Sequence, residues 1–222
     1  MEKKLFKRIL LLAFLMTLGS QATFAQDFSA VNDEGMTLCY NILYEDDEPT
    51  TMVELTSGGK ITNYSGVIVV PSTVVNPNDG QTYTVAGIGE NAVYNCDQVT
   101  SVQLPNTIIF IGNRAFYDCD YLQSINFPEG LVWIGDYAFT YAQFSQVVLP
   151  STLEYLGSNA FQWCYNIQTV ICKGTTPPEL GGTIFRSDVY YSAKLLVPAT
   201  ALEAYQNASG WGTGSSYYFY VY

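Results

Sequence analysis

Apolar and polar residues alternate in short runs along most of this chain, and the runs recur at a nearly constant interval. The segments "VQLP", "INFP" and "VVLP" alternate in this way and end in proline, at Pro105, Pro128 and Pro150. Alternation predicts half-buried β-strands, because successive side chains of a strand point to opposite faces. Proline then ends each strand, since it has no backbone N–H to donate to a ladder.

A second phrase follows each of these strands. It reads "IGNRAFYDC" at residues 111–119, "IGDYAFTYA" at 134–142 and "LGSNAFQWC" at 156–164. A unit of this size is too short to bury its own apolar side, so neighbouring copies must stack into a solenoid with a continuous core. The steps between copies are 23, 23 and 22 residues, counted on the glycine of each copy: Gly89, Gly112, Gly135 and Gly157.

We expect the strands of successive copies to pair in parallel, with alternate side chains inside and outside. The expected inward residues are Val102, Leu104, Ile125, Phe127, Val147 and Leu149. On the outer face, Gln103, Asn126 and Val148 are small or neutral residues that suit a shallow contact surface. An ordinary solvated sheet is the open alternative for this face.

One further position outside the predicted core holds an aromatic residue in three successive copies: Phe110, Trp133 and Tyr155, with Gly87 in the first copy. Stacked coils would place these rings in a row, and aromatic rings present rigid faces for sugars or protein side chains. The row is our main candidate ligand-binding surface, together with Gln103, Asn126 and Val148. The structural alternative is that the rings stack on each other and shield the core beneath them.

A second aromatic set surrounds the last position of the nine-residue phrase. Its members change register between copies, which indicates variable surface decoration: Tyr117, Tyr121, Tyr141, Trp163 and Tyr165. Exposed aromatic residues on a surface poor in lysine favour recognition over an inert scaffold.

The consensus "L-x-x-I-x-F-P-x-x-L-x-x-I-G-x-x-A-F-x-x-C" resembles the BspA-like leucine-rich repeat family of bacterial surface proteins, and residues 63–172 follow it copy by copy. The resemblance implies a protein that contacts host extracellular proteins or other cells, since members of that family act as adhesins. Three departures are Val93 in place of Phe, Ala142 in place of Cys, and the 22-residue step. We expect them to cause small local adjustments only.

The predicted fold is therefore a β-rich solenoid of leucine-rich-repeat-like coils of about 23 residues, closed by two caps. Residues 26–62 alternate and predict an N-terminal β cap, and residues 63–172 form the repeats. Residues 173–222 form a C-terminal cap with one short helix near Ala199–Ala208 and a last strand at "YYFYVY".

Residues 1–25 have the features of a secretory signal peptide: a basic start, the apolar run "ILLLAFLMTLG", and small residues before a cut after Ala25. No cysteine lies near the cut, so a lipoprotein anchor is not expected. No later run is long enough for a membrane span. These features predict an exported protein that is secreted or at the cell surface, with the periplasm left open.

The net charge of the chain excludes further classes of binding partner. Removing Lys3, Lys4, Lys7, Arg8 and Glu2 leaves 5 basic and 19 acidic residues, a net charge of −14. Such a surface repels phosphate backbones and anionic membranes, so nucleic acid is not an expected partner. The chain has no histidine, which excludes Ser-His-Asp catalysis and histidine-based zinc sites.

The remaining residues carry no recognisable catalytic motif, and we predict no enzyme, no metal site and no cofactor. The five cysteines are odd in number, so at least one thiol is unpaired within the chain. Cys96, Cys119 and Cys164 share one repeat position and are predicted to be buried small residues. The acidic run "YEDDEP" at 44–49 lacks the spacing of a calcium loop, and "NPNDGQ" at 76–81 predicts a turn.

The sequence thus predicts an exported ligand-binding or adhesion protein that contacts host extracellular proteins or neighbouring cells. Two alternatives stay open: a glycan-binding protein that uses the aromatic row, and a structural surface component without a specific ligand. The oligomeric state is not indicated.

Overall fold

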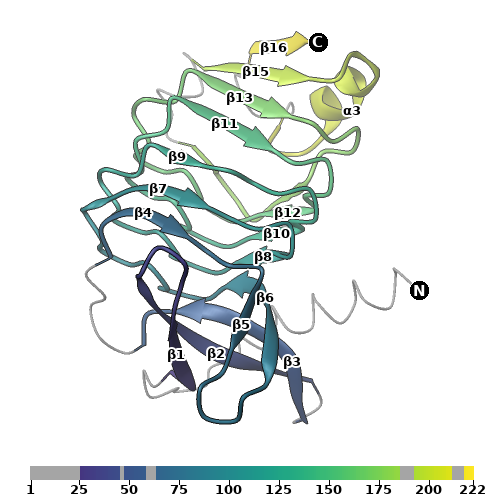
Figure 1. The fold of residues 1–222 in the computed structure, drawn as a ribbon. Helices are drawn as coiled ribbons and strands as arrows, with labels where there is room; N and C mark the ends of the chain where they lie inside the picture. Colours follow the sequence, from purple (N-terminus) through teal and green to yellow (C-terminus); the bar gives the residue numbers. More distant parts are fainter. Residues whose placement is uncertain (1–25, 46–47, 59–63, 186–192, 212–217) are drawn as a thin grey trace.

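The computed structural model describes residues 26–45, 48–58, 64–185, 193–211 and 218–222, and the predicted signal peptide lies outside these ranges. The described chain winds into a β-solenoid of about five turns, in which strands of successive turns pair in parallel (Figure 1). The predicted fold class is confirmed.

One side of each coil carries the strands that were predicted from the alternating runs. They form two separate parallel sheets. The first consists of β4 (Gly66–Val69), β7 (Val99–Gln103) and β9 (Ser124–Ile125). The second consists of β11 (Gln146–Leu149), β13 (Thr169–Cys172), β15 (Lys194–Val197) and β16 (Tyr218–Val221). We number the coils from the glycines of the repeated phrase, so that the first coil runs from Gly89 to the residue before Gly112. Within residues 64–185 no strand pair joins β9 to β11, so this side is interrupted between the second and third coils.

The opposite side of the coils carries one continuous ladder of short parallel strands. Each contributes the pair of residues before the conserved glycine of the nine-residue phrase. The strands are β6 (Thr82–Ile88), β8 (Phe110–Ile111), β10 (Trp133–Ile134), β12 (Tyr155–Leu156) and β14 (Glu179–Leu180). The backbone register places Gly87, Phe110, Trp133 and Tyr155 side by side.

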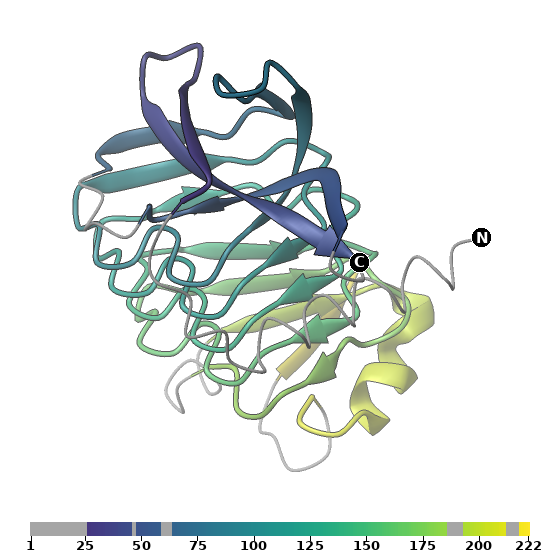
Figure 2. The same ribbon diagram turned by 90° about the horizontal axis from the view of Figure 1, so that it is seen from below.

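The N-terminal strands cover the end of this ladder. β1 (Phe28–Val31), β2 (Thr37–Glu45) and β3 (Glu48–Thr56) pair antiparallel in that order, and β3 then pairs in parallel with β6. Figures 1 and 2 show them at the end of the stack opposite β15 and β16. The extra residues of the first copy form a hairpin between β5 (Thr73–Val75) and β6, and 76–81 form its turn, as predicted.

The corners between the two sides form a third set of inter-coil hydrogen bonds. In the second coil the backbone N–H groups of Arg114, Phe116 and Asp118 donate to carbonyl groups of the third coil. The backbone of this corner is not an ordinary strand, because two residues per copy adopt left-handed angles. The pairs are Asn91 and Asn95, Arg114 and Asp118, Tyr137 and Tyr141, and Asn159 and Trp163. This ladder explains why the nine-residue phrase recurs.

The predicted inward residues line the core, with one local exception. Val102, Leu104, Val147 and Leu149 are buried, as are the phenylalanines of the repeated phrase. Ile125 and Phe127 are only half-buried. Both belong to the coil that borders the interruption between β9 and β11, so the missing ladder leaves its neighbouring strand partly open to solvent.

The C-terminal segment covers the other end of the stack with one short helical segment and one strand. The 3-10 helix η1 (Ala199–Ala201) leads into α3 (Leu202–Asn207), as predicted near these residues, and β16 adds the predicted last strand. The indole N–H of the buried Trp211 donates to the Pro178 carbonyl at 2.8 Å and fixes this segment to the last coil. In the part of the chain that the structure describes, no helix has the length and apolar character to cross a membrane.

Candidate functional site

The predicted aromatic row lies on the continuous ladder, but its first ring is not on the surface. We call Phe110, Trp133 and Tyr155 the strand row. Phe110 is only 5% exposed and packs in a small cluster with Leu43 of β2 and with Ala86. The expectation that this position lies outside the core is therefore wrong for Phe110, because the N-terminal strands extend over the first coils and cover it.

The other two rings of the strand row pack against each other. Trp133 and Tyr155 are half-buried and stack with ring centroids 3.7 Å apart and planes 12° from parallel. Glycines lie at both ends of the row. A Cβ on Gly87 would lie 2.1 Å from the Phe110 ring, and one on Gly181 would collide with the Tyr155 hydroxyl. The row is thus a self-packed stack that fits between two glycines.

The predicted contact residues on the other side of the coils are not brought together. Gln103 is exposed, Val148 is half-buried, and the interrupted ladder lies between their strands. The amide of Asn126 accepts from the Leu104 N–H and donates to the Leu104 carbonyl, at 2.7 Å each. Asn126 therefore continues the bonding between the first and second coils beyond the two residues of β9, which is a structural role.

Four members of the second aromatic set, all except Tyr121, join with Tyr94 in a continuous line of rings along the corners. Tyr94 stacks on Tyr117 with ring centroids 5.3 Å apart, and Tyr117 meets Tyr141 edge to face at 6.0 Å. Trp163 stacks on Tyr141 at 6.2 Å and contacts Tyr165 at 6.0 Å. We call these five residues the corner ridge. The line is not evident in the sequence, because its rings occupy different positions of the phrase in different copies. The two left-handed residues of each corner turn neighbouring side chains in different directions, which allows these rings to meet.

A groove adjoins the corner ridge at the third coil. Other copies place two residues between the cysteine position and the next core residue, as in Asp120–Tyr121 and Tyr165–Asn166, whereas the third copy has only Gln143. The backbone bond shifts accordingly: the Gln143 N–H donates to the carbonyl of the core residue Leu122 at 2.8 Å. The 22-residue step is this deletion, and it occurs in the coil where the strand ladder is interrupted. Its consequence exceeds the small adjustment that we expected.

The groove has a volume of about 1010 Å³ and extends over three successive coils. Tyrosine, amide and hydroxyl side chains dominate its lining. The lining residues are Asp120, Tyr121, Gln123, Ser124, Tyr141, Gln143, Ser145, Tyr165, Asn166 and Gln168. We call this hollow the corner groove. Its three tyrosines and the short step are visible in the sequence, but the sequence does not show that they meet at one place.

The lining of the corner groove carries a small negative charge. Of the described residues that line it, none is basic, and Asp120 is the one acidic member. Partial burial raises the pKa of the Asp120 carboxyl, and the neighbouring Asp118 and Asp97 raise it further. The groove is therefore suited to uncharged or basic groups and unfavourable for anions.

The corner cysteines are buried in the core, as predicted. The Cys119 thiol donates to the Val93 carbonyl at 2.9 Å, and the Cys164 thiol donates to the Phe139 carbonyl at 3.1 Å. Burial raises the pKa of Cys119 to about 12. Because the thiolate is the reactive form, these cysteines join neighbouring coils and are not nucleophiles.

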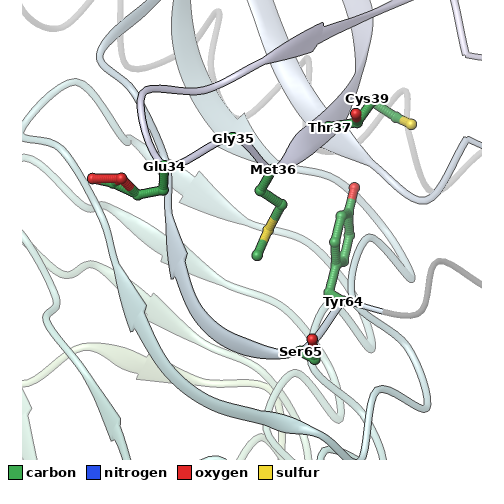
Figure 3. Close-up of a pocket in the computed structure, with 7 residues that line it drawn as sticks. All are labelled: Glu34, Gly35, Met36, Thr37, Cys39, Tyr64 and Ser65. Atoms are coloured by element: carbon green, nitrogen blue, oxygen red, sulfur yellow. The ribbon is translucent and has the colours of Figure 1, made fainter.

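A second hollow, of about 530 Å³, lies between the turn after β1 and the segment that begins at Tyr64. Figure 3 shows Met36 and Tyr64 side by side in it, with Glu34 directed away from them. Residues 59–63, which precede Tyr64, lie outside the described ranges. We assign no function to this hollow.

The repeated coils match a known family of repeats. The description "BspA type Leucine rich repeat region", with six copies, matches residues 86–193. The coils are BspA-type leucine-rich repeats. The family region starts later than the predicted 63–172 and extends to residue 193, after the last of the full copies that the glycine pattern marks.

The solved structures that match this chain include bacterial leucine-rich repeat proteins. A T. pallidum leucine-rich repeat protein has 22% identity and a TM-score of 0.56, covering 80% of this chain and 70% of its own. A leucine-rich repeat protein from Bacteroides capillosus has 24% identity and a TM-score of 0.51, covering 67% of this chain and 100% of its own. The pneumococcal vaccine antigen PcpA has 14% identity and a TM-score of 0.52, covering 80% of this chain and 51% of its own.

These likenesses establish the fold. None of the curated proteins matches the chain. Leucine-rich repeat scaffolds of this kind are typically non-enzymatic, and bacterial surface proteins with such repeats fit a protein-binding or adhesion role. The proteins that carry BspA-type repeats are typically at the cell surface or secreted.

Proposed function

We propose that this protein is an exported adhesion protein that contacts host extracellular proteins or other cells through its corner ridge. The observation that carries the proposal is the distribution of exposed apolar side chains. Within the described part of the BspA-type region, the large exposed ones are Tyr94 and Tyr165 of the corner ridge and Tyr121 of the adjoining corner groove. Tyrosine is enriched and lysine depleted where proteins bind each other.

The physical properties of the corner ridge support this role. Its rings contact one another from the first coil to the fourth, so little side-chain freedom remains to be lost on binding. Tyrosine hydroxyl groups add polar contacts at the rim of such a surface. After cleavage of the signal peptide the net charge is −14, which favours partners that are neutral or basic on the contact surface.

The strand row remains a second candidate contact surface. Trp133 and Tyr155 are half-buried and could present one edge of their stack to a partner. Gln103 and Val148 would then belong to a separate contact on the opposite side. The corner ridge is favoured because all the strongly exposed aromatic residues of the coils lie along the corners.

Binding by purified protein tests the role of the corner ridge. The protein would be titrated against immobilised extracellular matrix proteins and against whole epithelial and bacterial cells. We expect Tyr117→Ala to weaken a detected interaction at least fivefold, since buried interface tyrosines contribute on the order of 1 kcal/mol or more. Tyr218→Ala is the control, because Tyr218 is 64% exposed but lies in β16. Equal loss in both variants, or no binding to any of these targets, would contradict the proposal.

Export is part of the same proposal and has its own test. The apolar run after the basic start would direct the chain across the inner membrane, and cleavage after Ala25 would leave Gln26 as the first residue. N-terminal sequencing of the protein from the cell surface or medium should therefore begin at Gln26. An N-terminus at Met1 in cytoplasmic protein would overturn it.

A further inference from the structure

We propose that the corner groove is a binding site for a neutral oligosaccharide. This site adjoins the corner ridge and shares Tyr141 and Tyr165 with it, but amide and hydroxyl side chains make up most of its lining. It exists because the third coil lacks one corner residue, so that its single Gln143 lies between the two-residue corners that hold Tyr121 and Tyr165.

The two outer tyrosines provide the apolar part of such a site. Tyr121 is 56% exposed and Tyr165 is 54% exposed, and they come from the coils on either side of the shortened one. Sugar rings have one face of C–H groups, which packs on the flat face of an aromatic ring. Two tyrosines separated by one coil can therefore contact two different rings of a chain that runs along the solenoid.

Two side-chain amides in the lining of the corner groove are held by hydrogen bonds. The Asn166 amide N–H donates to the Gln143 side-chain oxygen at 2.8 Å, and the Gln143 amide donates to the Tyr141 carbonyl at 3.0 Å. Each amide carries two N–H groups, so both keep one N–H, and Asn166 also keeps its oxygen. These fixed donors and acceptors match the adjacent hydroxyl groups of a sugar without a large ordering cost.

The neighbouring polar residues extend this match along the groove. Gln123 follows the core residue of the corner one coil before the shortened one, and Gln168 follows the core residue one coil after it. Their backbone N–H groups donate to the carbonyl groups of Thr100 and Ser145. Their side chains are exposed. The result is a line of amides that follows the solenoid axis, which fits an extended chain of repeating units better than a single small molecule.

Charge selects among the possible chains. The lining contains no basic residue among those described, and Asp120, together with Asp118 and Asp97, makes the surroundings acidic. Uronic acids, sialylated glycans and phosphates would be repelled. A lysine-rich peptide would be attracted, but the lining has one carboxylate, Asp120, for its cationic groups, and the other lining side chains are neutral. A neutral oligosaccharide would contact both the tyrosine rings and the side-chain amides.

The direct test is a titration of the purified protein with hexasaccharides of neutral glucan, mannan, xylan and galactan, followed by calorimetry. The comparison ligands are a polygalacturonate hexamer and a lysine-rich peptide. We expect at least one neutral hexasaccharide to bind, and Tyr121→Ala and Tyr165→Ala each to weaken it about fivefold or more. Tyr218→Ala should leave the affinity unchanged. Tyr117→Ala should also leave it unchanged, which separates this site from the protein contact on the corner ridge.

A length variant tests the structural origin of the site. Insertion of one asparagine between Gln143 and Phe144 restores the 23-residue step and should fill the groove. The folded insertion variant, checked by circular dichroism, should lose the hexasaccharide affinity at least tenfold. The proposal is overturned if none of the neutral hexasaccharides binds, if only the peptide or the polygalacturonate binds, or if the tyrosine variants bind as tightly as the wild type.

Discussion

The two aromatic lines of this protein are built from similar residues and behave differently. The strand row keeps one position in three successive copies, and the backbone ladder places its rings side by side, with Phe110 covered by Leu43 and Trp133 stacked on Tyr155. The corner ridge changes position between copies, yet its rings meet through Tyr94, Tyr117, Tyr141 and Trp163 and end in exposed tyrosines. Constant register in a solenoid therefore indicates packing more directly than it indicates recognition.

The largest expected difference between the two lines is in stability. Phe110→Ala removes a buried ring and leaves a cavity beneath the N-terminal strands, so it should lower the free energy of unfolding by about 3 kcal/mol. Tyr94→Ala removes an exposed ring of the corner ridge and should cost less than about 1 kcal/mol. Urea denaturation of both variants measures the difference. Equal losses would show that the two lines do not differ in their structural role.

A glycine at the end of the strand row gives the next largest effect. Gly87→Ala would place a Cβ 2.1 Å from the Phe110 ring, and overpacking of this kind costs about 2 kcal/mol. The double variant Gly87→Ala with Phe110→Leu should recover part of the loss, because a smaller side chain leaves room for the methyl group. Thermal unfolding of the single and double variants tests this coupling. Additive losses would contradict the proposed packing.

The sheet that carries the strand row also buries a carboxyl group, which predicts a pH dependence. Burial raises the pKa of Glu54 to about 7, and Glu90 and Asp27 contribute to the rise. Because the folded pKa lies above the ordinary value of 4.5, the stabilisation is complete below about pH 4.5 and is lost as the pH rises through about 7.

Substitution of this carboxyl should remove the pH dependence. Glu54→Gln should be more stable than the wild type at pH 8 by on the order of 1 to 2 kcal/mol, a value below the full shift because the residue is partly exposed. At pH 4 the two proteins should be nearly equal. Urea denaturation at both pH values measures this, with Asp33→Asn at an exposed position as the control. An unchanged pH profile in Glu54→Gln would contradict the assignment.

The smallest predicted effect concerns the corner backbone. Arg114 has a φ of +51°, whereas the first and fourth copies place Asn91 and Asn159 at the equivalent left-handed position. Asparagine tolerates this conformation better, so Arg114→Asn should stabilise the protein by about 0.5 kcal/mol. The Arg114 guanidinium also lies 5.7 Å from the centre of the Tyr137 ring. A fall in the thermal midpoint would show that this contact outweighs the backbone strain.

Much of the fold could be predicted from the sequence, because the interval and the residue pattern of a repeat define the geometry of each coil. The alternating runs before Pro105 and Pro128 and the glycines at a fixed step predicted parallel coils, and the last strand and the short helix were also found. Burial of Phe110 could not be predicted, since the covering residue Leu43 comes from a segment outside the repeats.

The candidate site was harder to predict than the fold for a similar reason. The deletion at Gln143 was visible as a 22-residue step, but its effect depends on how three coils meet at the corner. The corner ridge depends on left-handed backbone angles at residues such as Tyr141 and Trp163, which carry no sequence signal as glycine would. The structure was needed to bring Tyr121, Gln143 and Tyr165 together around one groove.

Two tryptophans provide the most direct test of the account, because one belongs to each aromatic line. Trp163→Ala and Trp133→Ala would be compared for adhesion to the target that the wild type binds and for thermal midpoint. We predict that Trp163→Ala loses at least fivefold in affinity with little change in midpoint, and that Trp133→Ala lowers the midpoint but binds normally while folded. The reverse result, with binding lost only in Trp133→Ala, would place recognition on the strand row and contradict the account.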